Sequence, residues 1–175
     1  MSRIDFDQLP DASRVWVFGV SEGLSASDEA SFLAVVDGFL DGWAAHGHAL
    51  RCGRDWRHGR FLLVGVDEAT EPSSGCSIDA LVRVLKDEQQ RLGVAIVDNT
   101  AVWYLEDGEV RRVTRAEFKA LADAGRVDAH TVIFDNTVTR LAEVREGGWE
   151  RAARDSWHYR AFFPSSAEAV EQPTN

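Results

Sequence analysis

Hydrophobic and polar residues follow two periods along the chain, one typical of strands and one typical of helices. Short apolar, β-branched and aromatic runs predict strands at residues 14–20, 48–56, 61–66 and 101–105. Apolar residues three and four positions apart predict one helix from Ser25 to about His46 and another from Ser77 to about Gly93. The order of elements is therefore strand, helix, strand, strand, helix, strand.

This order predicts an α+β protein with a ferredoxin-like βαββαβ core, an antiparallel sheet with both helices on one face. The chain continues with a hairpin around Asp107-Gly108, a helix capped by Thr114 and a strand at 131–134. We interpret these as a C-terminal β-hairpin and helix extension of the core. The pattern gives one domain over residues 1–163 and a flexible polar tail over 164–175.

The segment that opens the second helix combines a thiol, hydroxyl groups and a carboxylate. Ser77 is predicted to cap the helix, Asp79 to complement its dipole, and Gly75 to supply the turn before it. Cys76 then lies beside the positive end of the helix, a position that favours the reactive thiolate. The unpaired N–H groups of such a turn can bind an anion.

The predicted topology also brings a histidine to this segment. The end of the first helix and the start of the second meet at one edge of the sheet, so His46 is expected near Cys76. A thiol with a neighbouring imidazole is the pair that a nucleophilic cysteine needs, so Cys76 and His46 are the candidate catalytic residues. A loop that only caps a helix is the competing interpretation.

Two further polar segments are candidates for contacts with a ligand. Asp135-Asn136-Thr137 follows a strand, and residues 156–160 combine aromatic, imidazole and guanidinium groups. Turn formation or capping is the favoured interpretation of the first segment, and anchoring of Trp157 in the core explains the second equally well. The predicted ligand-binding residues are Ser74, Gly75, Ser77, Asp79, Trp43 and His158.

Composition excludes several functional classes. A net charge of −10 argues against binding to nucleic acid or to an anionic membrane. No secretory signal or apolar spanning segment is visible, and two cysteines make no disulfide framework, so we expect a cytoplasmic protein with reduced thiols. The spacing of the histidines and cysteines matches no zinc pattern, and neither a metal nor another cofactor is expected.

The residues Trp43, His46 and Ser74-Gly75-Cys76-Ser77-Ile78-Asp79, together with Ser156-Trp157-His158, resemble an uncharacterised bacterial family with an SGCSID-like motif. The resemblance covers most of the chain and implies no activity. Some of these sequences are labelled ABC-transporter ATPases. This chain has no GxxxxGK[ST] phosphate-binding loop, so that activity is not carried over.

The sequence therefore predicts a binding domain with its site at Ser74 to Asp79, taking a small anionic ligand or a protein partner. Two alternatives remain open. One is a cysteine-dependent enzyme or thiol redox sensor that uses Cys76 with His46. The other is a structural subunit that forms a homodimer.

Overall fold

The computed structural model describes residues 3–69 and 71–163, and within them the chain divides into two compact units. Unit 1 comprises residues 1–99 and 136–147, and unit 2 comprises 100–135 and 148–175. The chain therefore passes between the units three times. The single domain over 1–163 stays a prediction, and the predicted tail lies outside the described residues.

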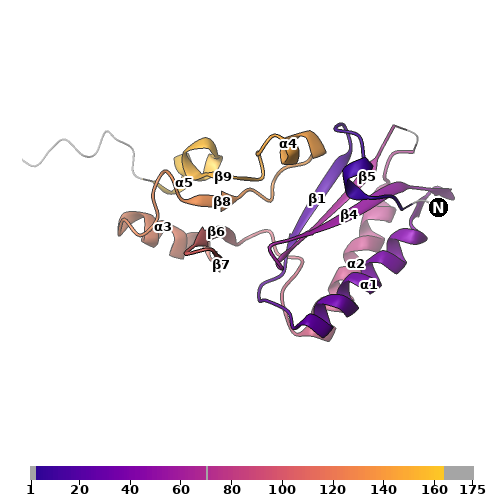
Figure 1. Cartoon of the computed structure of the whole chain (residues 1–175), viewed down its shortest axis with the longest axis horizontal. Helices are drawn as coiled ribbons and strands as arrows, with labels where there is room; N and C mark the ends of the chain where they lie inside the picture. Colours follow the sequence, from indigo (N-terminus) through magenta and orange to yellow (C-terminus); the bar gives the residue numbers. More distant parts are fainter. Residues whose placement is uncertain (1–2, 70, 164–175) are drawn as a thin grey trace, which may run out of the picture. The chain divides into compact units, whose positions relative to one another are not determined.

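Unit 1 is an antiparallel sheet with two long helices on one face, as Figure 1 shows. The strand order is β1-β5-β4, and both pairings are antiparallel. A 3₁₀ turn, a two-residue hairpin and a short helix complete the unit. The elements are η1 (Phe6–Gln8), β1 (Arg14–Gly19), α1 (Ala26–Asp41), β2 (Ala44–Ala45), β3 (His48–Ala49), β4 (Arg51–Arg57), β5 (Phe61–Asp67), α2 (Gly75–Leu92) and α4 (Leu141–Arg145).

The α+β class is confirmed, but the strand order does not confirm a ferredoxin-like core. That core would place the fourth predicted strand on the outer edge of β1. Here residues 139–140 occupy that edge. The Val15 amide donates to the Thr139 carbonyl at 2.9 Å, and the backbones of Arg14 and Arg140 form an isolated antiparallel β-bridge. The fourth strand, β6 (Val102–Glu106), instead pairs with strands of unit 2.

The two faces of the unit 1 sheet are filled by different parts of the chain. Phe18, Leu62, Val64 and Val66 pack with the buried stripes of α1 and α2. On β4 and β5 the paired glycines Gly53 and Gly65 leave room for residues 4–9. A Cβ at Gly53 would lie 2.6 Å from the Ile4 carbonyl oxygen, so the backbone itself occupies that space. The glycine that weakens the strand pattern in the sequence therefore accommodates the N-terminal segment.

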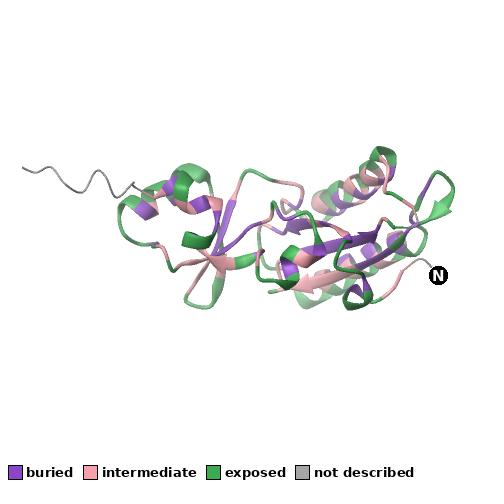
Figure 2. Ribbon diagram, turned by 90° about the horizontal axis from the view of Figure 1, so that it is seen from above, coloured by how far each residue is buried: buried purple, intermediate pink, exposed green. Residues whose placement is uncertain are grey.

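Unit 2 contains a four-stranded antiparallel sheet of order β7-β6-β8-β9. Its core is small and surrounds Phe118, whose ring lies 5.6 Å from that of Tyr104 and 5.4 Å from that of Phe162. Its buried strand residues lie on the two central strands, β6 and β8, whereas the edge strands β7 and β9 carry only intermediate and exposed residues; Figure 2 colours the chain by this burial. Besides β6 the elements are β7 (Glu109–Val113), α3 (Arg115–Asp123), β8 (Val132–Phe134), β9 (Glu150–Ala152), η2 (Ala153–Asp155) and α5 (Trp157–Phe162).

Candidate functional site

The N-cap of α2 lies three residues earlier in the chain than its sequence pattern predicts. The helix begins at Gly75 rather than Ser77, and Ser74 is the N-cap. The two serines bond reciprocally: the Ser77 amide donates to the Ser74 hydroxyl at 3.1 Å, and the Ser74 amide donates to the Ser77 hydroxyl at 2.9 Å. Ser77 was wrongly predicted as the N-cap because it acts as the third residue of a capping box, a role usually taken by Glu or Gln.

Further bonds fix this turn from outside. The Ser73 amide and hydroxyl both donate to Glu68, at 3.3 and 2.5 Å. The buried indole N–H of Trp43 donates to the Ser77 carbonyl oxygen at 2.9 Å. Trp43 and Ser77 were predicted to bind a ligand, but these contacts engage both in holding the turn.

The exposed part of the turn is narrower than predicted. Gly75, Cys76 and Asp79 are exposed, and Ser74 is half-buried. The first turn contains no acidic residue, because the earlier helix start moves Asp79 beyond it. Within the described part of the chain, the amides of Gly75 and Cys76 have no acceptor, as is usual at a helix start.

His46 lies in a hairpin rather than at the end of a helix. Helix α1 ends at Asp41, and β2 and β3 follow, joined by His46 and Gly47. Both joining residues have positive φ, 50° and 82°, which suits a tight two-residue turn. The Trp43 to Ser77 bond confirms that this region lies beside the start of α2. Among the described residues, however, no hydrogen bond joins His46 to Cys76.

The two cysteines have opposite environments. Cys76 is exposed, whereas Cys52 is fully buried and directs its thiol toward the Leu40 carbonyl oxygen at 3.5 Å. Burial raises the pKa of the Cys52 thiol to about 12. Cys76 is therefore the cysteine that reagents or partners in solution can reach.

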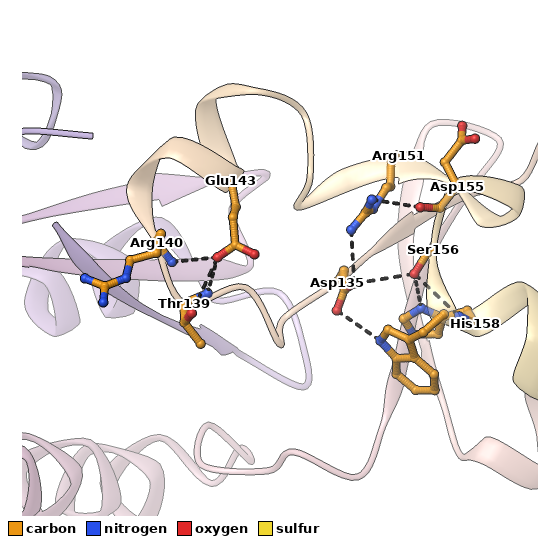
Figure 3. A network of polar contacts seen from close by, with 9 residues as sticks. Asp135, Thr139, Arg140, Glu143, Arg151, Asp155, Ser156 and His158 are labelled. Carbon is orange, nitrogen blue, oxygen red and sulfur yellow. Dashed lines mark hydrogen bonds and ion pairs between the residues drawn. The ribbon is translucent and has the colours of Figure 1, made fainter. Parts of the chain in front are cut away.

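A second polar cluster unites the two segments that the sequence left as separate candidates (Figure 3). We call Asp135, Arg151, Ser156, Trp157 and His158 the Asp135 cluster; all belong to unit 2. The buried Asp135 carboxylate accepts from the Trp157 indole at 3.2 Å and from the Ser156 hydroxyl at 3.4 Å. Arg151 lies 3.5 Å from the same carboxylate. The sequence signal was a carboxylate directly after a strand, but spacing alone could not pair it with residues 21 or 22 positions later.

His158 is buried at the centre of this cluster rather than exposed to a ligand. Its side chain lies against the Trp157 ring, with centroids 3.9 Å apart, and its Nδ1 is 2.8 Å from the Ser156 hydroxyl. Burial lowers the pKa of His158 to about 4. Ser156 stands between Asp135 and His158, whereas a catalytic triad places histidine in the middle, so the cluster is not arranged to activate the serine.

Residues 3–69 and 71–163 contain neither a cluster of metal ligands nor a helix able to span a membrane. No three His, Cys, Asp or Glu side chains there gather to hold a metal ion. No helix in those ranges is both long and apolar enough to cross a bilayer. No protein-family model matches the chain, and no curated protein or solved structure is significantly similar to it. The resemblance to a bacterial family therefore stays a prediction.

Proposed function

We propose that this chain is a binding protein that presents the start of α2, residues 74–79, to a protein partner. The observation that carries the proposal is a turn that is both fixed and exposed. The Ser74 and Ser77 bonds and the Trp43 indole hold its backbone, while Gly75, Cys76 and Asp79 face solvent. A surface ordered before binding loses little conformational entropy when a partner contacts it.

Charge favours a protein partner over a small anion. Residues 68–79 contain three acidic side chains and no basic one, so the local charge does not favour a free anion. The amides of Gly75 and Cys76 can still donate to a backbone carbonyl oxygen of a partner, which is polar but neutral. The two unpaired cysteines support a cytoplasmic location for this interaction.

Cross-linking from position 76 tests the proposal. A photoreactive residue replaces Cys76 in one variant and the exposed Ala34 of α1 in a matched control. We expect a discrete adduct from position 76 alone, and purified partner should bind an Asp79→Lys variant at least about tenfold more weakly than the parent. Equal adducts from both positions, or unchanged affinity, would contradict the proposal. Saturable shifts of the Gly75 and Cys76 amides with inorganic phosphate would instead favour an anion site.

Thiol chemistry at Cys76 is the second candidate, and the contrast between the cysteines favours it. Cys76 is exposed at the start of an 18-residue helix, whereas Cys52 is buried. Alkylation by iodoacetamide should therefore modify Cys76 alone in the folded protein. A rate above that of a model cysteine peptide, reduced by His46→Ala, would support a reactive thiol with an imidazole partner. A rate equal to the peptide's would make Cys76 an ordinary surface residue.

A further inference from the structure

The Asp135 cluster attaches the last described helix to the sheet of unit 2. Asp135 follows β8 directly, whereas Ser156 caps α5 and Trp157 begins it. Two bonds to one carboxylate, from the Ser156 hydroxyl and the Trp157 indole, thus join α5 to the end of a central strand. Beside the His158 ring, at 6.1 Å between centroids, Phe162 packs on Phe118. The position of α5 depends on a few polar contacts as well as on this small core.

The arrangement of protons in the cluster follows from what each group can donate. The ionised Asp135 carboxylate only accepts, so the bond to it uses the single proton of Ser156. His158 Nδ1 must then donate to the Ser156 oxygen, 2.8 Å away. The His158 backbone amide also points to that oxygen, at 3.5 Å. The neutral tautomer with its proton on Nδ1 satisfies all of these contacts together.

Protonation of the second ring nitrogen would put a cation into this site. His158 is 4% exposed, so a charged ring would lose nearly all of its hydration. Three charged groups face the ring from the elements around it: Asp135 at the end of β8, Arg115 of α3 and Arg151 of β9. The two guanidinium groups oppose the charge and the carboxylate favours it, but burial is the largest effect.

We propose that His158 acts as an acid-sensitive latch: the neutral ring holds residues 156–162 on the sheet of unit 2, and mild acid shifts the equilibrium toward their release. Release lets the charged ring reach water and frees the Trp157 indole from Asp135. Transfer to a compartment of lower pH would thereby change how unit 2 presents α5. The latch is independent of the site at the start of α2.

The direction of the pH dependence follows from linkage. The pKa of His158 is about 4 when α5 is attached and near its ordinary 6.5 when the ring is exposed. The released state therefore binds more protons between these values, so attachment weakens as the pH falls from about 6.5 toward 4. At pH 5 the equilibrium constant for release should be about 30-fold larger than at pH 7.5.

Hydrogen exchange on the full chain tests the latch. Protection of the amides of residues 156–162 and of the Trp157 indole, corrected for intrinsic rates, should fall about 30-fold from pH 7.5 to pH 5. In His158→Phe, which keeps an aromatic ring on Trp157 but cannot be protonated, protection should change little over this range. The exposed His130 of the same unit provides a matched control, because His130→Gln should keep the full pH effect.

Direct titration of the parent protein gives an answer even where a variant fails to fold. Nitrogen and carbon resonances of the His158 ring should report the Nδ1–H tautomer at pH 7 and protonation well below the ordinary histidine pKa of 6.5. A His158 that titrates near pH 6.5 would overturn the proposal. The same acid loss of protection in His158→Phe as in the parent would also overturn it.

Discussion

The two units achieve order by different means. Unit 1 has a three-stranded sheet whose middle strand, β5, is buried along its whole length, with α1 and α2 against one face and residues 4–9 against the other. Unit 2 has four short strands, a small core around Phe118 and a buried carboxylate, Asp135, that ties separate segments together. Apolar packing in unit 1 depends on no single contact, whereas a few residues determine the order of unit 2.

Charge is also divided unequally. Unit 1 carries 18 acidic against 11 basic side chains, and unit 2 carries 11 against 8. Most of the net negative charge therefore belongs to unit 1. The acidic character on which the choice of partner depends is a property of unit 1.

The largest difference should appear when each core loses one side chain. Phe118→Ala should lower the free energy of unfolding of unit 2 by about 4 kcal/mol, because the ring contacts several others in a small core. Amide exchange read separately for each unit measures the effect, and unit 1 should stay protected. Leu81→Ala in α2 is the matched change for unit 1, at about 3 kcal/mol. Loss of amide protection in both units of Phe118→Ala would show instead that the chain unfolds as the single domain its sequence predicts.

Unit 1 should be most sensitive where backbone fills the space beside a glycine. Gly53→Ala should cost about 3 kcal/mol, because its Cβ would meet the Ile4 carbonyl oxygen and the sheet or the N-terminal segment would have to move. Urea unfolding measures the change. Gly38→Ala is the control, since nothing lies near a Cβ there, and it should stabilise α1 by roughly 1 kcal/mol. Similar values for both variants would contradict the close approach of residue 4.

The units should also respond to acid in different ranges. Hydrogen bonds and charge from Arg54 hold the pKa of Asp37 below its usual value, so that stabilisation is present at neutral pH and is lost only below about pH 4. Unit 2 should instead weaken from about pH 6.5, by roughly 2 kcal/mol at pH 5, through His158. Exchange protection in each unit from pH 7.5 to pH 3.5 measures this, with Asp37→Asn as the variant that flattens the unit 1 curve. If protection in the two units fell over the same pH range, the predicted difference between their acid responses would be wrong.

The smallest effect concerns the turn that opens α2. Ser74→Ala should cost about 1 kcal/mol, because it leaves the Ser77 amide without its acceptor. Thermal unfolding measures the change. Cys76→Ser provides the control, because an exposed side chain without structural contacts should change stability by less than about 0.5 kcal/mol. A larger loss in Cys76→Ser than in Ser74→Ala would mean that the thiol has a structural role.

Local signals in the sequence were sufficient wherever neighbouring residues decide the structure. The Asp107-Gly108 and His58-Gly59 turns have the positive φ values that tight hairpins require, and the Thr114 cap forms as predicted. The predicted end of α1, near His46, was wrong because Trp43 continues the apolar spacing of the helix, which ends at Asp41. That indole instead leaves the helix to reach the Ser77 carbonyl, a contact 34 residues away.

Long-range pairing was the part that periodicity could not supply. The pattern of the strand at 102–106 fits the edge of either sheet equally well. In the structure residues 139–140 pair with the edge of β1, and the strand lies in the sheet of unit 2. The contacts within the Asp135 cluster were not predicted for the same reason, since each of its segments also resembles a turn or a cap. Of the candidate site, Cys76 and Asp79 are exposed, and their functional roles stay predictions. The buried structural contacts of Trp43, Ser77 and His158 were not predicted.

The interleaved path of the chain has a consequence for synthesis. Residues 136–147 complete unit 1 by pairing with β1 through Thr139, yet they follow the first three strands of unit 2 in the chain. A growing polypeptide therefore exposes the outer edge of β1 until residue 139 leaves the ribosome, after β6, β7 and β8 have already emerged. During that interval β6, a strand of similar apolar character, is a competitor for the same edge. Correct folding depends on β6 finding β7 first, which the short Asp107-Gly108 turn makes the faster event.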